Sequence, residues 1–256
     1  MFKRIRIAIL LYVLLFVAAS QFVASMNSTD WDTPLWVDVY VANGDGSESA
    51  ADYVDSLPND EFTAIESFFR DEAHRFGIDL ARPLRFTPAT KLDASVPEIP
   101  SGAGWLDTLV WSLKMRWLTT KLNWRSDGPS PDIVLFTLFH DADGAPVLER
   151  SGALRKGLIA VANVFADRRI RSANQVVIAH ELLHTLGATD KYDPQTNLPL
   201  YPLGFAQPDA RPLYPQATAE IMAGRIPVSQ TEALIPASLS QVIVGAATAA
   251  EIRWTD

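Results

Sequence analysis

Cysteine is missing from the chain, and histidine occurs only four times in its 256 residues. The absence of cysteine excludes disulfide bonds, thiolate metal sites and cysteine nucleophiles. Positive charge is also scarce, because 22 lysines and arginines stand against 30 aspartates and glutamates, which gives a net charge of -8. A protein with this balance has no broad basic surface for nucleic acid, so we expect no nucleic-acid partner.

The composition is otherwise that of a folded protein. Apolar residues make up 48% of the chain and charged residues 20%. This is enough apolar material to bury a core, and it excludes a disordered or collagen-like chain. The length allows one large domain or two small ones. Since the sequence has no internal repeat and no clear linker, we expect one domain over residues 27–256.

The N-terminal segment has the pattern of an export signal or a membrane anchor. Three bases within residues 3–6 precede an apolar run from Ile7 to Ala19, and small residues follow at Val23 and Ser25. This pattern predicts a secretory signal that is cleaved after Ser25. If the run is extended to Met26, it approaches the ~20 residues that span a bilayer. Both interpretations export the remainder, which is then secreted, periplasmic or anchored with its domain on the non-cytoplasmic side.

The rest of the sequence predicts an α/β (α+β) fold with a mixed twisted sheet and packed helices. Segment 133–139 is almost entirely apolar, which is typical of a central strand covered on both faces. The other predictions follow from hydrophobic periodicity and from turn residues. We expect strands over 36–42, 84–86, 133–139 and 158–165, and helices over 58–76, 105–122, 172–186 and about 238–252.

The helix predicted over 105–122 has an apolar stripe at helical spacing. Lys114, Arg116 and Lys121 lie off this stripe and are expected to face away. We interpret the stripe as the side that packs against the core. Its members are Leu106, Leu109, Val110, Leu113 and Trp117.

The strongest functional signal is the segment His180 to Asp190, which reads HExxHxxGxxD. On a helix, His180 and His184 lie one turn apart on the same face, so both imidazoles can reach one metal ion. Glu181 is one step around the helix, where its carboxylate can reach a metal-bound water. Gly187 can adopt the left-handed conformation that ends a helix, and Asp190 then becomes reachable as a third ligand. Three protein ligands and one open position are the requirement of a catalytic zinc.

A second feature follows about thirty residues later, where Met222 precedes Ala-Gly. Together with HExxHxxGxxD, it resembles the metzincin clan of zinc endopeptidases. The motif is similar to that of the snapalysin-like members, in which the third ligand is Asp where the commoner pattern has His.

This resemblance implies a metzincin-like zincin fold with an active-site helix and a Met-turn. It implies that His180, His184 and Asp190 bind one catalytic Zn²⁺ and that Glu181 is the general base. It further implies that Met222 packs below the ligands. The substrate would be a protein or peptide, hydrolysed through a zinc-activated water.

Two further roles are left open by the sequence. The strand predicted over 158–165 is our candidate for the edge strand that pairs with an extended substrate. Tyr192, Tyr201 and Tyr214 are alternative candidates for stabilising the oxyanion, and the sequence does not choose between them.

Alternative interpretations keep the two histidines but change the rest. A gluzincin-like peptidase would take a distant Glu as its third ligand, with Glu220 or Glu232 as candidates, and His140 or His74 are other potential donors. A different class is a non-catalytic exported zinc-binding or scaffold protein. Glu181 argues against that class, because a structural zinc site does not need a carboxylate at this position. The sequence carries no signal of an oligomeric state.

Overall fold

The computed structural model describes residues 29–100, 104–123, 130–143, 151–154 and 158–255, and Tyr12 as a single further residue. The predicted signal or anchor, residues 1–26, therefore lies almost wholly outside the described residues. Within the described parts, no helix has both the length and the apolar character that crossing a bilayer requires.

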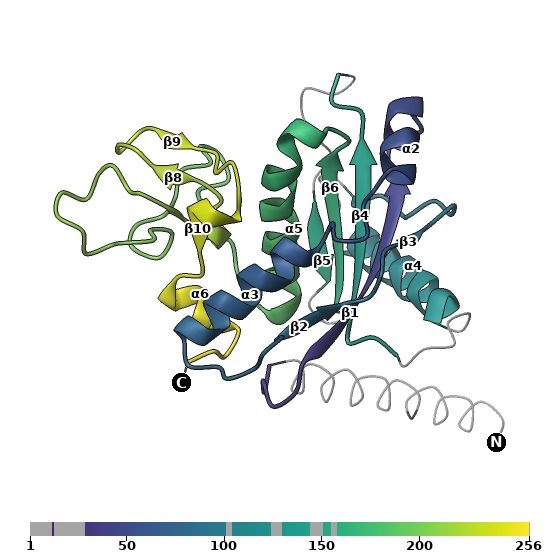
Figure 1. Cartoon of the computed structure of the whole chain (residues 1–256), viewed down its shortest axis with the longest axis horizontal. Coiled ribbons are helices and arrows are strands. Elements are labelled where there is room, and N and C mark those ends of the chain that lie inside the picture. The colour runs from purple at the N-terminus through teal and green to yellow at the C-terminus, as the bar shows by residue number, and fades with distance from the viewer. Residues whose placement is uncertain are drawn as a thin grey trace.

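A mixed sheet forms the centre of the molecule (Figure 1). Its strand order is β2-β1-β4-β6-β5, and β3 also pairs with β1. All pairings are parallel except that of β5 with β6, which is antiparallel. The strands are β1 (Leu35–Asn43), β2 (Leu84–Phe86), β3 (Thr90–Lys91), β4 (Ile133–His140), β5 (Gly152–Leu154) and β6 (Ile159–Phe165).

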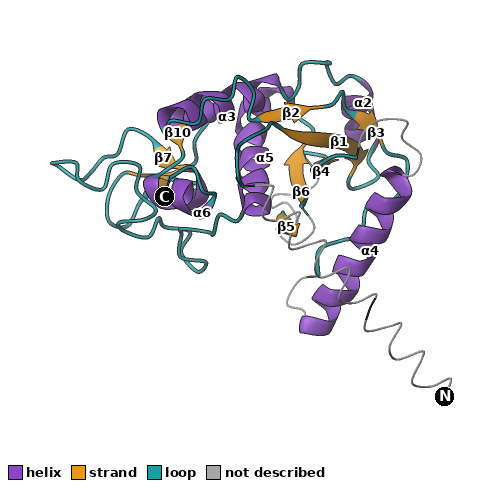
Figure 2. Ribbon diagram, turned by 90° about the horizontal axis from the view of Figure 1, so that it is seen from below, coloured by secondary structure: helices purple, strands orange, loops and turns teal. Residues whose placement is uncertain are grey.

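Helices cover both faces of this sheet, as Figure 2 shows. α3 (Thr63–Arg75) and α5 (Arg171–Leu186) pack on one face, and α4 (Trp105–Asn123) packs on the other. The remaining helices are α2 (Glu48–Asp55) and α6 (Ala246–Glu251). The C-terminal part adds four two-residue strands, β7 (Ala219–Glu220), β8 (Ile226–Pro227), β9 (Ala233–Leu234) and β10 (Val242–Ile243).

Alternation along the strands creates two separate hydrophobic clusters. In β1, Val39 and Val41 belong to the cluster shared with α3 and α5, whereas Tyr40 belongs to the cluster shared with α4. Tyr40 stacks on Phe136 of β4 with ring centroids 5.6 Å apart. Because successive strand residues point to opposite faces, one buried strand can supply both clusters.

The prediction for the apolar side of α4 is wrong. The helix contacts the sheet through Trp111, Met115 and Leu118, which are at most 6% exposed. All five residues of the predicted stripe are instead between 47% and 66% exposed. The physical reason is that α4 has apolar side chains on two opposite sides, and periodicity cannot tell which side meets the sheet.

The helix predicted over about 238–252 is also only partly right. Residues 242–243 form β10, which pairs in parallel with β7, and α6 begins at Ala246. The backbone N–H of Val244 donates to Oε2 of the Glu72 side chain at 2.6 Å. Tertiary hydrogen bonds therefore replace the local helical bonds that the apolar spacing suggested.

The edge-strand prediction for segment 158–165 is likewise wrong. β6 lies between β4 and β5, and nearly all of its residues are buried. The edge position belongs to β5, because Ala153 and its two neighbours pair antiparallel with the start of β6. Segment 152–154 reads Gly-Ala-Leu and has no β-branched or aromatic residue to mark a strand in the sequence.

Candidate metal centre

α5 carries the first part of the motif and ends within it. Its last residue is Leu186, and Gly187 follows in the left-handed conformation with φ 114°. The N–H groups of Gly187 and Ala188 both donate to the carbonyl oxygen of Leu183, at 3.1 and 3.0 Å. These bonds close the helix and turn the chain sharply, which brings the following residues back toward the histidines.

The turn places Asp190 beside both imidazoles. Its Oδ1 lies 3.2 Å from Nε2 of His180 and 3.1 Å from Nε2 of His184. Ligand atoms from all three residues lie within 4.8 Å of one another. Among the described residues, this is the group of acidic and histidine side chains that is close enough to hold one metal ion.

Backbone carbonyl groups orient both imidazole rings. Nδ1 of His180 lies 2.9 Å from the carbonyl oxygen of Ile221, and Nδ1 of His184 lies 2.9 Å from that of Ala188. In the neutral tautomer with Nδ1 protonated, each ring donates to its carbonyl and directs the Nε2 lone pair toward the shared point. Two such nitrogens and one carboxylate oxygen are a suitable donor set for zinc.

The close packing shifts the pKa of two of these groups. Burial lowers the pKa of His180, but the hydrogen bond with Asp190, the charge of Glu181 and the contact with Ile221 outweigh it, so the net pKa is raised. Burial also acts on Asp190 and would raise its pKa. Hydrogen bonds with His180 and His184 dominate there and hold the pKa of Asp190 well below its ordinary value. Asp190 is therefore the anionic member of the group at neutral pH.

Glu181 is 6% exposed and faces a pocket next to the imidazoles. The pocket has a volume of about 230 Å³ and is also bordered by His180 and Tyr192. Its other walls are mainly apolar, and they include Val176, Val177, Ile221, Ile235 and Pro236. Glu181 and His180 thus border the same, mainly apolar recess.

Met222 is completely buried in a short 3-10 turn, Ile221–Ala223, that ends at Gly224 with φ 68°. Its carbonyl oxygen accepts a hydrogen bond of 2.9 Å from the backbone N–H of Lys191. The preceding carbonyl, of Ile221, contacts His180. Ile221 thus contacts the helix that carries His180, and Met222 binds the loop that carries Asp190.

A side chain from α6 fixes the loop around Asp190. Oε2 of Glu251 accepts from the backbone N–H of Thr189 at 2.9 Å and from Nζ of Lys191 at 2.7 Å. Its Oε1 accepts from the Thr189 hydroxyl at 2.6 Å. Lys191 is 3% exposed and also donates to the carbonyl oxygen of Thr189. The sequence reasoning missed Glu251, because nothing in the motif indicates which distant residue supports it.

Glu220, the alternative third ligand, is fully buried and engaged elsewhere. Its carboxylate accepts from the N–H groups of Ala223 and Gly245, at 3.0 and 3.1 Å, and from the Thr248 hydroxyl at 2.6 Å. Burial raises the pKa of Glu220 despite these bonds. This residue joins the Met222 turn to α6 and is not part of the group around Asp190.

The other alternative ligands also lie apart from the candidate centre. Nε2 of the buried His140 lies 2.8 Å from Oδ1 of Asn163. Nε2 of His74 lies 3.3 Å from the carbonyl oxygen of Leu80 on the surface of α3. Glu232 is exposed just before β9. None of the three belongs to the His180 group.

The three tyrosine candidates are not equally placed. Tyr192 borders the pocket that contains Glu181 and His180. Tyr201 and Tyr214 pack edge-on against the ring of Phe205, with centroids 5.4 and 5.8 Å away. Only Tyr192 of the three therefore borders this recess.

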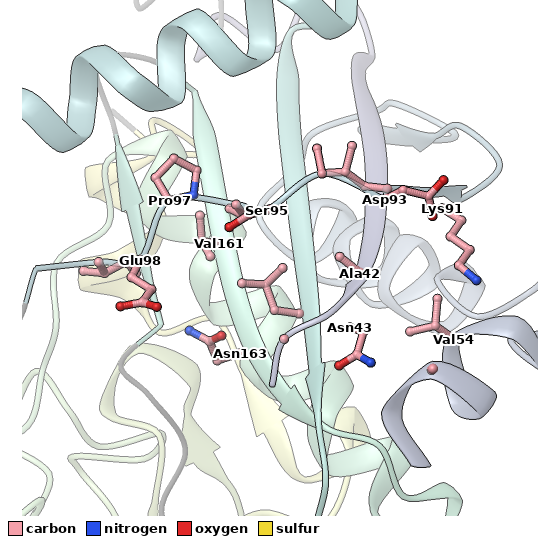
Figure 3. A pocket seen from close by; sticks show the side chains of 17 residues that line it. Ala42, Asn43, Val54, Lys91, Asp93, Ser95, Pro97, Glu98, Val161 and Asn163 are labelled. Carbon is pink, nitrogen blue, oxygen red and sulfur yellow. The ribbon is translucent and has the colours of Figure 1, made fainter. Parts of the chain in front are cut away.

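A second pocket, of about 420 Å³, lies at the carboxyl ends of the parallel strands (Figure 3). Asn43 and Asn163 lie at its strand side, and the segment from Lys91 to Ile99 runs across it. At Gly44, an added Cβ would lie 2.4 Å from Nε2 of His140, so any other residue would require the imidazole to move. The pocket contains no residue of the HExxHxxGxxD motif.

Comparison with known proteins yields a partial structural likeness. No family model matches the chain, and no curated protein matches it in sequence. Two crystal structures of OgpA from Akkermansia muciniphila are similar in part, one of the wild type and one of a catalytically inactive form in complex with an O-glycopeptide (glycodrosocin) substrate. They have TM-scores of 0.37 and 0.40 and sequence identities of 14% and 13%.

The aligned region covers 62% of this chain in both cases, and 49% and 50% of the two OgpA chains. The chain thus spans about half the length of these proteins. The chemistry of the site rests on its own geometry, above all on the position of Asp190 between the two imidazoles.

Proposed function

We propose that this chain is an exported zinc-dependent endopeptidase. The observation that carries the proposal is the convergence of His180, His184 and Asp190 on one point, with Nδ1 of both rings held by carbonyl groups. Three protein ligands with an open fourth position are characteristic of catalytic rather than structural zinc. Zinc would be held by Nε2 of each histidine and by a carboxylate oxygen of Asp190.

The reaction would combine the metal with the adjacent carboxylate. When bound, zinc would lower the pKa of the attacking water and polarise the scissile carbonyl group. Glu181 accepts a proton from the attacking water on a carboxylate oxygen and passes it to the leaving nitrogen. Because Glu181 is almost fully buried, little bulk water competes for this proton. Tyr192, which borders the same pocket, would donate its hydroxyl to the oxyanion.

The surroundings also suggest how a substrate would bind. The recess beside Glu181 is mainly apolar, so we expect it to accept an apolar side chain next to the scissile bond. β5 is an edge strand of the sheet, and α5 packs against it. Within the described residues, no strand pairs with its outer edge, and an extended peptide would add there by backbone hydrogen bonds.

Zinc content tests the ligand set. The purified wild-type chain should hold about one zinc, and Asp190→Ala should lose most of it because only two ligands remain. Glu220→Gln is the matched control, since its carboxylate lies outside the group and zinc should be retained. The measurement is metal analysis after gel filtration. Loss of zinc in Glu220→Gln with retention in Asp190→Ala would favour the gluzincin-like alternative.

Glu181→Gln separates metal binding from catalysis. The amide cannot take a proton from water, so peptide cleavage should fall by at least about 100-fold. Zinc should stay bound, because Glu181 is not a ligand in this proposal. The measurement is cleavage of a mixed peptide library by the zinc-loaded protein. If the wild type binds zinc but cleaves no member of the library, the non-catalytic scaffold interpretation replaces the peptidase.

A further inference from the structure

α4 exposes a continuous apolar face on the side that does not contact the sheet. At about 100° per residue, the five side chains fall within roughly one third of the helix circumference. Trp117 is the most exposed, at 66%, and Nζ of Lys121 lies 5.1 Å from its ring centroid. The full set is Leu106, Leu109, Val110, Leu113 and Trp117, and we refer to it as the outer face of α4.

Basic residues border this face on both sides. Lys114 and Lys121 lie along one border, and Arg116 lies along the other. Asp107 is the single acid in the helix. α4 is therefore locally basic in a chain whose net charge is -8. A helix with aliphatic and tryptophan side chains on one face and bases beside it has the pattern of an interfacial membrane helix.

The position of α4 agrees with a surface that faces a membrane. α4 lies on the sheet face opposite α3 and α5, so contact there leaves the candidate metal centre open to solution (Figure 2). Trp36 of β1, 40% exposed, shares the α4 face with Tyr40 because strand residues alternate. Trp36 thus adds one exposed aromatic ring on the same side of the sheet as α4.

The apolar N-terminal segment would keep the folded part of the chain near a bilayer. Trp31 packs on Trp254 with ring centroids 5.7 Å apart and donates to the carbonyl oxygen of Ile252. Trp31 follows Met26 by five positions, a stretch that spans at most about 18 Å. If residues 1–26 stay in the membrane, the folded part is confined to the bilayer surface.

We propose that the outer face of α4 docks on a lipid bilayer that carries anionic headgroups. Its apolar side chains enter the acyl boundary, and Lys114, Arg116 and Lys121 contact the headgroups. A second copy of the chain is a poorer occupant. Two copies could pair these faces with their α4 helices parallel or antiparallel. Because both borders of the face are basic, each arrangement brings like charges together.

The absence of cysteine allows a direct test with the full chain. Leu113→Cys and, in a separate protein, Leu234→Cys each introduce a single thiol for an environment-sensitive fluorophore. The two leucines are 58% and 61% exposed, and Leu234 lies in β9, outside α4. Each protein is placed in vesicles of phosphatidylcholine and phosphatidylglycerol, with and without a lipid that carries a shallow nitroxide quencher.

The label at position 113 should shift its emission to shorter wavelength and be quenched by the nitroxide lipid, and the label at 234 should show neither effect. Lys114→Glu combined with Lys121→Glu should reduce the quenching at 113, because the charge attraction is reversed. Near-ultraviolet circular dichroism checks that each variant is folded. A label at 113 that stays in water overturns the proposal. The proposal is also overturned if the emission at 113 shifts to shorter wavelength but the nitroxide lipid does not quench it. In that case a protein segment or a second copy covers the face.

Discussion

At the scale of single residues, the position of Asp190 depends on a side chain about sixty residues further along the chain. Glu251 accepts three hydrogen bonds from Thr189 and Lys191, the two neighbours of Asp190, and one of the donors is a buried ammonium. Loops are intrinsically adaptable, so a carboxylate on a loop needs such supports to stay in place. Glu251 is thus a positioning residue for the candidate centre and does not itself reach the imidazoles.

Glu251→Gln should weaken zinc binding by about 10- to 100-fold, the usual effect of losing a group that orients a ligand. The amide removes the negative charge beside the buried Lys191 ammonium and keeps only one of the two acceptor oxygens, so the loop that carries Asp190 gains freedom. Zinc affinity measured by competition with a chelator checks this. Glu232→Gln, an exposed change on another part of the chain, is the matched control and should leave the affinity unaltered. Equal affinities in the two variants would show that the loop holds its position without Glu251.

At the scale of the elements, α4 shows why an apolar pattern is not yet a core. The helix buries Met115 completely and leaves Leu113 58% exposed, although the two residues are close in sequence and both are apolar. Met115 belongs to the same hydrophobic cluster as side chains of β1, β4 and β6, among them Tyr40 and Phe136. Only the burial that accompanies these contacts contributes to folding.

Met115→Ala should therefore lower the free energy of unfolding by about 2–5 kcal/mol, the range for emptying a buried site of this size. Leu113→Ala on the same helix should change it by less than about 0.5 kcal/mol. Urea unfolding in detergent solution, followed by circular dichroism, compares the two. A large loss for Leu113→Ala would mean that the outer face of α4 is covered within the protein itself.

At the scale of the whole molecule, the candidate centre joins parts of the chain that are remote in sequence. α5 packs against β6 and β4, and the turn around Met222 is linked through Glu220 to Gly245 and Thr248 near the C-terminus. A metal bound by His180, His184 and Asp190 would couple these parts, because it binds the folded chain and not the unfolded one.

Zinc should accordingly raise the thermal stability of the whole chain. At a free zinc concentration 100 times the Kd, linkage predicts about 2.7 kcal/mol of added stability. For a protein of this size, that corresponds to an increase in Tm of roughly 5–10 °C. Differential scanning calorimetry with and without a chelator measures the effect. Asp190→Ala should show little of this increase, and an increase of the same size in that variant would place the stabilising metal elsewhere.

What the sequence determined by itself is local in origin. The spacing of His180 and His184 follows from the helical period, the end of α5 follows from Gly187, and β1 and β4 follow from short β-branched and apolar runs. Each of these depends on interactions between residues that are near one another in the chain, and such interactions can be read from a pattern.

Only the tertiary structure decided the rest. It chose which side of α4 meets the sheet, placed β5 outside β6, and assigned Glu220 and Glu251 to supporting hydrogen bonds. In each case, two or more partners compete for the same apolar face, sheet edge or carboxylate, and the outcome depends on how distant segments pack. A one-dimensional pattern shows that a group needs a partner, and the folded chain selects which partner it receives.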